Sequence, residues 1–285
     1  MTKLTGASYV KIALILLFGL LLIGAVGFGG VAGCTLRGLS FDGTAEAGDA
    51  SVDAAGIRNL SIAWAAGSVT VSVVDDAETD GAIELVETAA RGVTKSQQMR
   101  WDASGDTLKV DYGTWFSCFM LDKKDLEVRI PQSRAADLGT VSIDGASGRY
   151  SMQGIDCDAL DIRLASGEVD ADDLSAREFS VDVASGKAFV SGRFEESVRL
   201  RTASGESRIT CEGACPRSVD VDVASGNVSL LLPDNEGFTA RVDKASGSFE
   251  TTFPMTQNGS LYVYGQGGSS IDVDLASGTF RLEKS

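Results

Sequence analysis

The sequence predicts an all-β fold, specifically a parallel β-helix or β-solenoid with coils of roughly 20 residues and Ser-Gly corners. The tripeptide Ala-Ser-Gly recurs at a nearly constant interval, with longer steps toward the C-terminus. Apolar and polar residues alternate on both sides of the tripeptide, as at Leu160, Ile162 and Leu164, which is the pattern of a strand with one buried face. Since a propeller blade needs about 40 residues, stacked coils fit this spacing better.

Each repeat is therefore predicted to be a strand, a corner and a second strand. The glycine is expected to supply a backbone conformation with φ > 0, which other residues adopt only with strain. The same spacing begins early, because Leu60, Ile62 and Trp64 precede Gly67 as a degenerate first coil. The predicted corner glycines are Gly67, Gly148, Gly167, Gly186, Gly205, Gly226, Gly247 and Gly278.

The N-terminal residues predict a membrane segment. Residues 12–33 form an apolar run without a charge, and as a helix it would extend roughly 33 Å, enough to cross a bilayer core. Lys3 and Lys11 precede it, so residues 1–11 should be a cytoplasmic tail and the rest extracytoplasmic. The alternative is a lipoprotein anchored at Cys34, because Val31-Ala32-Gly33-Cys34 is similar to a lipobox. Either reading predicts attachment to the cell membrane.

Three further regions follow the predicted anchor. Residues 34–56 are small, polar and acidic and predict a spacer. Residues 57–135 predict an irregular β part that covers one end of the stack, with strands at 83–87 and 126–130 and a hairpin over 99–112. Residues 136–285 carry the regular repeats, and the long step before Ala276 leaves the register of the last coil open.

These features resemble a known bacterial family. An N-terminal membrane segment, a strand such as Leu126-Glu127-Val128-Arg129-Ile130-Pro131, and regularly spaced Ser-Gly corners are similar to the "putative adhesin" family of β-strand-repeat proteins, a domain of unknown function of the DUF4097 type. The resemblance covers about residues 57–285. It implies the β-helical architecture and a surface-binding role, and some relatives are linked to cell-envelope stress signalling. It implies no catalytic residues.

Composition argues against an enzyme and against nucleic-acid binding. The chain has no His and a formal net charge of −15, and such a surface repels polyanions. The repeated serines lack a Gly-x-Ser-x-Gly elbow and the usual base. A carbohydrate-active β-helix enzyme is disfavoured because the chain has no His, and because its coils are too short to carry the long loops that border a substrate cleft. We therefore expect no catalytic residues and no cofactor.

The Asp-x-Asp pairs, such as Asp220 with Asp222, raise the question of calcium. Calcium-binding β-rolls carry Gly-Gly-x-Gly-x-Asp turns, which are absent here. Stacking instead predicts a ladder of opposite charges on neighbouring strands, and we expect no metal site. Four places before the corner glycine the column reads Asp144, Arg163, Asp182, Arg201, Asp222, Asp243 and Asp274; six places before, it reads Ser142, Asp161, Ser180, Arg199, Asp220, Arg241 and Asp272.

The cysteines allow a disulfide between Cys211 and Cys215 and leave the wider connectivity open. Cys211 and Cys215 lie in a coil that is slightly longer than those before it, so a local bridge could staple the extra loop. A zinc site is not expected, because without His only four scattered thiols remain outside the membrane segment.

The sequence thus predicts a membrane-tethered, extracytoplasmic β-helical protein with a binding or scaffolding role, as the adhesin resemblance implies. The alternative is a regulatory protein that senses envelope stress through another membrane protein. The expected partner is an envelope or surface protein or glycan. Because the chain ends soon after Leu282 with no capping helix, its last coil is also predicted to expose an edge for self-association.

Overall fold

The computed structural model describes residues 45–90, 93–113 and 123–285. The predicted cytoplasmic tail, the apolar segment 12–33, Cys34 and Cys118 lie outside these residues. Within the part of the chain that is described, no helix is both long and apolar enough to cross a membrane.

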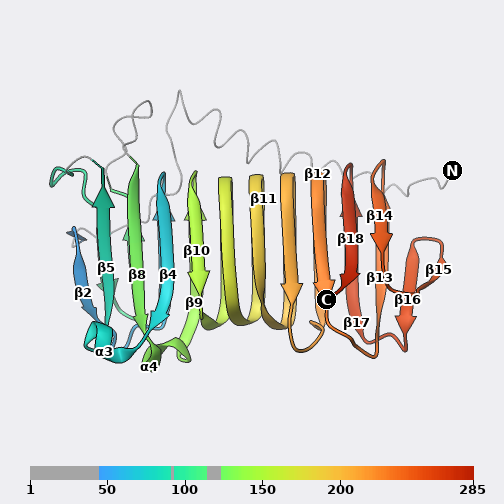
Figure 1. Cartoon of the computed structure of the whole chain (residues 1–285), viewed down its shortest axis with the longest axis horizontal. Coiled ribbons are helices and arrows are strands. Elements are labelled where there is room, and N and C mark those ends of the chain that lie inside the picture. Colours follow the sequence, from blue (N-terminus) through green and yellow to red (C-terminus); the bar gives the residue numbers. More distant parts are fainter. Residues whose placement is uncertain (1–44, 91–92, 114–122) are drawn as a thin grey trace.

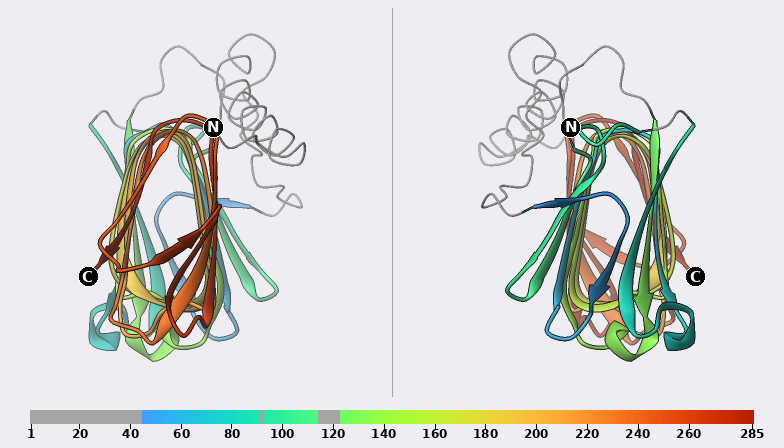
Figure 2. Two further views of the ribbon diagram at one scale, coloured as in Figure 1. Left: turned by 90° about the vertical axis from the view of Figure 1, so that its right-hand side faces the viewer. Right: turned by 90° about the vertical axis from the view of Figure 1, so that its left-hand side faces the viewer.

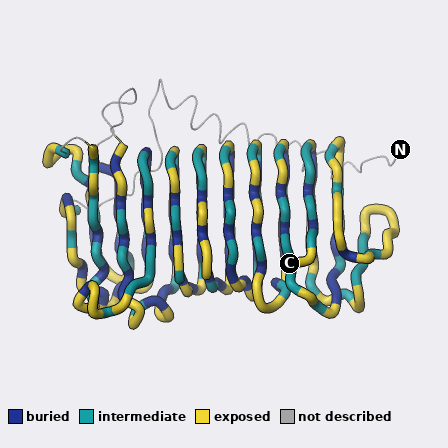
Figure 3. Tube along the Cα trace, viewed as in Figure 1, coloured by how far each residue is buried: buried dark blue, intermediate teal, exposed yellow. Residues whose placement is uncertain are grey.

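The fold is all-β, as predicted, and over the described residues it consists of one curled sheet of 18 strands. Figure 1 shows the coils side by side along the long axis, and Figure 2, which looks along that axis, shows each coil as an elongated ring with two flanks. We call the flank that contains the strands before the Ser-Gly corners the first flank and the flank that contains the strands after them the second flank; β7 and β8 belong to these flanks by their pairing with β3 and β4. Burial alternates along the strands of both flanks, because the inward side chains share one core; Figure 3 shows this alternation for the second flank, which faces the viewer.

The strands divide between these flanks as follows. The first flank contains β3 (Asn59–Trp64), β7 (Thr107–Asp111), β9 (Leu138–Gly145), β13 (Gly237–Lys244) and β17 (Ser269–Leu275). The second flank contains β4 (Ser68–Val74), β8 (Lys124–Pro131), β10 (Arg149–Gln153), β14 (Ser248–Thr251) and β18 (Thr279–Lys284). Two long strands, β11 (Asp156–Cys211) and β12 (Ser218–Leu232), pass through both flanks.

The coils pair in parallel with the register that the repeat predicts. Val141 of β9 pairs with Leu160 of β11, which occupies the same position one repeat later. Val198 of β11 pairs with Val219 of β12, across the first of the longer steps. Residues one repeat apart are therefore neighbours, and each apolar row continues from coil to coil.

The predicted corner glycines have the expected conformation with one exception. Gly67, Gly148, Gly167, Gly186, Gly205, Gly226 and Gly278 have φ between +100° and +157°. The corners also touch: a Cβ built on Gly167 would lie 2.1 Å from the carbonyl oxygen of Gly148. Gly247 has no positive φ, because its coil is outermost and its Cα faces the Leu275 side chain instead, with Cδ2 2.4 Å from a built Cβ.

The core is continuous along the stack and is filled by large residues at selected coils. Phe179 and Phe194 stack with ring centroids 4.4 Å apart. Tyr150 lies under the corner of its coil and donates a hydrogen bond from its hydroxyl to the Trp64 carbonyl at 2.9 Å. Its ring takes the space that a side chain at Gly145 would need, since a Cβ there would lie 2.5 Å from the Tyr150 ring.

At the N-terminal end, the first coil of the chain is not the first coil of the stack. The β3–β4 coil lies between the β7–β8 coil and the β9–β10 coil, with parallel pairing on both sides. Antiparallel strands then cover both flanks: β6 (Arg100–Ser104) pairs with β7, and β5 (Ala82–Ala89) pairs with β8. The hairpin predicted over 99–112 is thus confirmed as β6–β7.

Short elements complete this end. β1 (Glu46–Ala47) pairs with β6, and β2 (Ala50–Asp53) pairs with β5, both antiparallel. Two single-turn helices, α3 (Asp76–Thr79) and α4 (Gln132–Ala135), lie at the corners away from Ser-Gly, as Figure 1 shows. The edges of the terminal coil are therefore covered on both flanks.

At the C-terminal end, the last coil of the chain is also placed one position inward. The β17–β18 coil pairs with β12 on one side and with β13 and β14 on the other, and Figure 1 shows β18 between β12 and β14. The outer edge of β13 is covered by the antiparallel β16 (Leu261–Gly265), which pairs in turn with β15 (Thr256–Asn258). The expectation that the C-terminal coil forms an open edge is therefore wrong, because both of its sides are already paired.

Candidate functional site

A charged groove runs across the first flank in the middle of the stack. It has a volume of about 370 Å³ and crosses the outward faces of five neighbouring strand segments. Its lining combines polar and apolar surface. Outward positions of these strands carry charged and hydroxyl side chains, and Leu160, Phe179 and Val198, which also border the groove, are buried in the core. The outward lining residues are Thr140, Ala159, Asp161, Arg163, Glu178, Ser180, Asp182, Ser197, Arg199, Arg201, Ser218 and Asp220.

Ion pairs between neighbouring coils hold the charged side chains of this groove, as the predicted ladder requires. Arg163 Nη1 lies 3.5 Å from Asp144 Oδ1, and Arg201 Nε lies 3.2 Å from Asp222 Oδ2. Arg199 Nε lies 3.7 Å from Asp220 Oδ2. Most of these side chains are partly exposed, so each pair contributes only about 0–1 kcal/mol and chiefly fixes where the charges lie.

Asp182 differs from its neighbours because it is buried at the centre of the groove. It is 7% exposed, and Arg201 Nη1 approaches its Oδ2 only to 3.9 Å. Burial raises the pKa of Asp182 to about 6, despite the opposing effect of Arg201. Burial also raises the pKa values of Asp144 and Asp222 in the same column.

We expect Asp182→Asn to stabilise the protein above pH 6. The folded state holds the Asp182 proton more tightly than the unfolded chain, whose pKa is near 3.8, so stability falls as pH rises between these values. The gain should be about 1–2 kcal/mol at pH 7.5 and close to zero at pH 4. Urea unfolding at both pH values measures this gain in the free energy of unfolding. The control is Asp220→Asn, because the Asp220 side chain is half-exposed. A lower stability of Asp182→Asn at pH 7.5 would mean that its pairing with Arg201 outweighs burial.

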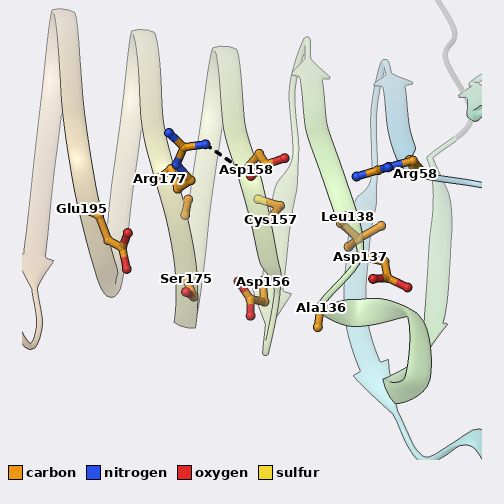
Figure 4. Close-up of a pocket in the computed structure, with 11 residues that line it drawn as sticks. Arg58, Ala136, Asp137, Leu138, Asp156, Cys157, Asp158, Ser175, Arg177 and Glu195 are labelled. Carbon is orange, nitrogen blue, oxygen red and sulfur yellow. Dashed lines mark ion pairs between the residues drawn. The ribbon is translucent and has the colours of Figure 1, made fainter.

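A second pocket, also of about 370 Å³, lies at the corner of the coils away from Ser-Gly. Figure 4 shows carboxylates from successive coils along it, with an ion pair between Arg177 Nη1 and Asp158 Oδ1 at 3.9 Å. Cys157 is buried among these residues, and burial raises the pKa of its thiol to about 12. The thiol therefore stays protonated at neutral pH, which argues against a reactive cysteine. The charged lining residues are Arg58, Asp137, Asp156, Asp158, Arg177 and Glu195.

Two of the corner serines, Ser147 and Ser246, have structural partners. The Ser147 hydroxyl donates to the Ala65 carbonyl at 3.0 Å, and the Ser246 hydroxyl donates to the Ala276 carbonyl at the same distance. Both bonds join neighbouring coils. Among the described residues, no group of three or more His, Cys, Asp or Glu side chains is placed to hold a metal ion.

Cys211 and Cys215 are both free thiols in this structure. Cys211 is buried in the core, and Cys215 is partly buried and packs against that core. Burial raises the pKa of each thiol. The bridge between them is not formed here and stays a prediction for the oxidised protein.

A buried ion pair at the N-terminal end was not foreseen from the sequence. Lys124 Nζ lies 2.6 Å from Glu87 Oε1, with side chains 4% and 3% exposed. The ammonium also donates to the carbonyls of Gln97 and Tyr112 and lies 4.1 Å from the Tyr112 ring centroid. Since the pair is enclosed, it ties the covering strands to the stack and offers no open ligand site.

Comparison with known proteins identifies a family and several solved structures. A family model described as Toastrack DUF4097 matches residues 76–283. A "putative cell adhesion protein" from Clostridium sporogenes is 12% identical with a TM-score of 0.40, covering 85% of this chain and all of its own. A "putative adhesin" from Bacteroides fragilis is 13% identical with a TM-score of 0.40, and the match covers 86% of this chain and 98% of the Bacteroides chain. A "Putative lipid binding protein" from Parabacteroides distasonis is 12% identical with a TM-score of 0.39, and the match covers 86% of this chain and 98% of the Parabacteroides chain. No curated protein matches the sequence.

Proposed function

The chain belongs to the Toastrack DUF4097 family, and we propose that it is a membrane-tethered, extracytoplasmic binding or scaffold protein without catalytic activity, of the adhesin type. We further propose that its curled sheet is a parallel β-helix. The apolar run at residues 12–33 supports the tether, and the parallel register between successive coils supports the β-helix.

The charged groove of the first flank is the observation that carries this proposal. It is a shallow surface that crosses five coils and offers guanidinium, carboxylate and hydroxyl groups in regular rows. Because strands rather than loops carry these groups, their spacing of about 4.8 Å between coils is fixed before any partner binds. Such a surface suits an extended polar partner, either a protein segment or a glycan.

The lack of a usual catalytic base supports a non-catalytic role. The sequence contains no His, the two corner serines described above bond to carbonyls of neighbouring coils, and the buried Cys157 keeps its proton. Among the described carboxyls that line the groove, Asp182 is distinguished by a pKa raised to about 6. The Asp182 carboxylate faces the Arg201 guanidinium, 3.9 Å away, and the charges of Asp161, Arg163 and Arg199 also act on it.

Photocrosslinking on intact cells tests the proposal. A photoreactive amino acid replaces Ser197, which lies in the groove, in the full-length protein expressed at native level. The matched control replaces Arg208, which is exposed on the second flank of the same coil. We expect position 197, and not position 208, to capture a partner that mass spectrometry identifies. Equal capture from both positions, or capture from position 208 alone, would contradict a role for the groove.

The captured molecule separates the two candidate functions. A host, matrix or neighbouring-cell surface molecule would support adhesion. A membrane kinase, transporter or cell-wall enzyme of the same cell would instead support the regulatory alternative, in which the protein acts through another membrane protein.

A further inference from the structure

The β17–β18 coil fills a slot whose walls are formed by residues earlier in the sequence. One wall of the slot is β12 and the other is β13 with β14. The walls belong to successive repeats, whose corner glycines are Gly226 and Gly247. The number of residues between these two glycines equals the number between Gly205 and Gly226, whose coils stack directly. The spacing of the walls would therefore also allow them to stack directly on one another, as the earlier coils do.

The slot recognises its occupant mainly through the backbone and buried apolar side chains. The Ala276 amide donates to the Val223 carbonyl at 2.9 Å on one side, and the Ser246 amide donates to the Ala276 carbonyl at 3.1 Å on the other. Phe280 and Leu282 are fully buried between the walls. None of these contacts requires the occupant to come from the same chain as the walls.

The connection that brings the occupant to the slot reverses sharply. β16 and β17 lie on opposite sides of β13, so the chain must turn around the end of β13 within residues 266–268. Gly265 and Gly267 have φ of +59° and +75°, which is the left-handed region. A tight reversal of this kind is a hinge at which an element can open outward and enter another copy.

Like charges face each other across the β12 side of this slot, unlike at the coil contact before it. Asp220 pairs in register with Asp272, and Asp222 with Asp274. Burial is the main cause of the raised pKa of Asp222, and the charges of Asp220 and Asp274 raise it further. At the preceding contact, by comparison, Arg201 Nε meets Asp222 Oδ2 at 3.2 Å. Since like charges on neighbouring strands are destabilising, the boundary between β12 and β17 carries repulsion where the preceding one carries attraction.

We propose that the β17–β18 coil is exchanged between two copies of this chain, so that the final coil of one copy occupies the slot of the other. The surface that receives it is the paired inner edges of β12 and β13–β14, and the partner is a second copy of the same chain. The exchange needs no contact beyond those already present, because it reuses the register of the closed chain.

Cysteine pairing between separately tagged full-length copies tests the exchange. Ser229 and Arg281 are register partners on β12 and β18 with outward side chains, and neighbouring strands are about 4.8 Å apart, within disulfide range. One copy carries Ser229→Cys and the other Arg281→Cys, and the two are coexpressed in one cell and then oxidised. We expect a disulfide-linked dimer that contains both tags and disappears when either position is restored.

Two matched controls make the result decisive. The single chain with both substitutions should form an internal bridge, which shows that the geometry permits the bond. Arg208 and Ser229, also register partners but joined without a long connection, should give no mixed dimer when their cysteines are on separate copies. Absence of the mixed Ser229→Cys and Arg281→Cys dimer, while the single chain bridges completely, would overturn the proposal.

The hinge supplies an independent measurement. Inserting Gly-Ser-Gly-Ser after Gly267 relaxes the reversal and should lower the yield of mixed dimer about threefold or more, because a longer hinge favours the closed chain. Deleting Gln266 and Gly267 should raise it. A yield that is the same in both hinge variants would contradict exchange through this connection.

Discussion

Replacing Gly167 with alanine is expected to lower the free energy of unfolding by about 4 kcal/mol or more, and in the less favourable case to prevent folding. Two costs combine at this position. The φ of +121° is one that a residue with a Cβ rarely adopts. The new Cβ would also lie 2.1 Å from the Gly148 carbonyl oxygen and 2.8 Å from its amide nitrogen, so two coils would have to separate where the Glu168 amide bonds to that carbonyl at 2.9 Å.

A second glycine separates these costs. Gly105, in the hairpin between β6 and β7, has φ of +70° but nothing within 4 Å of a built Cβ. Gly105→Ala should therefore cost only the conformational strain, about 1–2 kcal/mol. Urea unfolding of both variants beside the unsubstituted protein measures the difference. Equal losses would show that the contact between coils at Gly148 does not limit the side chain at position 167.

The central coils could be predicted from the sequence because one local pattern determines them. A glycine that needs φ > 0 sets the corner, and the alternation around it sets the buried face, so that Leu160 follows Val141 and Val219 follows Val198 in register. A shift by one residue would turn every apolar side chain outward. The pattern therefore admits one register, and the charge ladder follows from it.

The order of the terminal coils could not be predicted from that pattern. The coil at Gly247 and the coil at Gly278 share the spacing around the corner, although Lys244 and Thr251 stand where the later coil has Leu275 and Leu282. By spacing alone, either coil satisfies the register of β12. What places β17–β18 inside is the long connection, whose strand β16 pairs with the outer edge of β13. Pairing between distant segments leaves no periodic signal, and for the same reason the β3–β4 coil could not be placed between β7–β8 and β9–β10.

The sequence predicts which charged residues line up along the candidate groove, but not how deeply each of them is buried. The alternation of Arg163, Asp182 and Arg201 is visible in the sequence, and stacking makes them neighbours. The burial of Asp182 depends on how the side chains of the adjacent coils, Arg201 included, lie over it. A carboxyl with a pKa of about 6 is thus a property of the stacked coils, not of the repeat.

Lys124 gives the second large expected effect, because its charge is enclosed. Lys124→Met keeps the length of the side chain but leaves Glu87 buried without its cation, and we expect a loss of about 3–5 kcal/mol in the free energy of unfolding. The remaining partner of the carboxylate is the Met99 amide, whose nitrogen lies 2.9 Å from Oε1 and 3.0 Å from Oε2. Lys123, the exposed neighbour in the sequence, is the matched control, and Lys123→Met should change stability by no more than about 0.5 kcal/mol.

The double variant Lys124→Met with Glu87→Gln distinguishes a lost ion pair from lost packing. If the buried charge of Glu87 causes the destabilisation, removing that charge should restore part of the stability, and the double variant should be more stable than Lys124→Met alone. If the aromatic contacts of the lysine with Tyr112 and Trp64 matter more, the second substitution should add to the loss. Urea unfolding of the single and double variants decides between them. The ion pair joins β5, β8 and the end of β7, so the first outcome would show that one buried charge pair holds the covering strands on the N-terminal end of the stack.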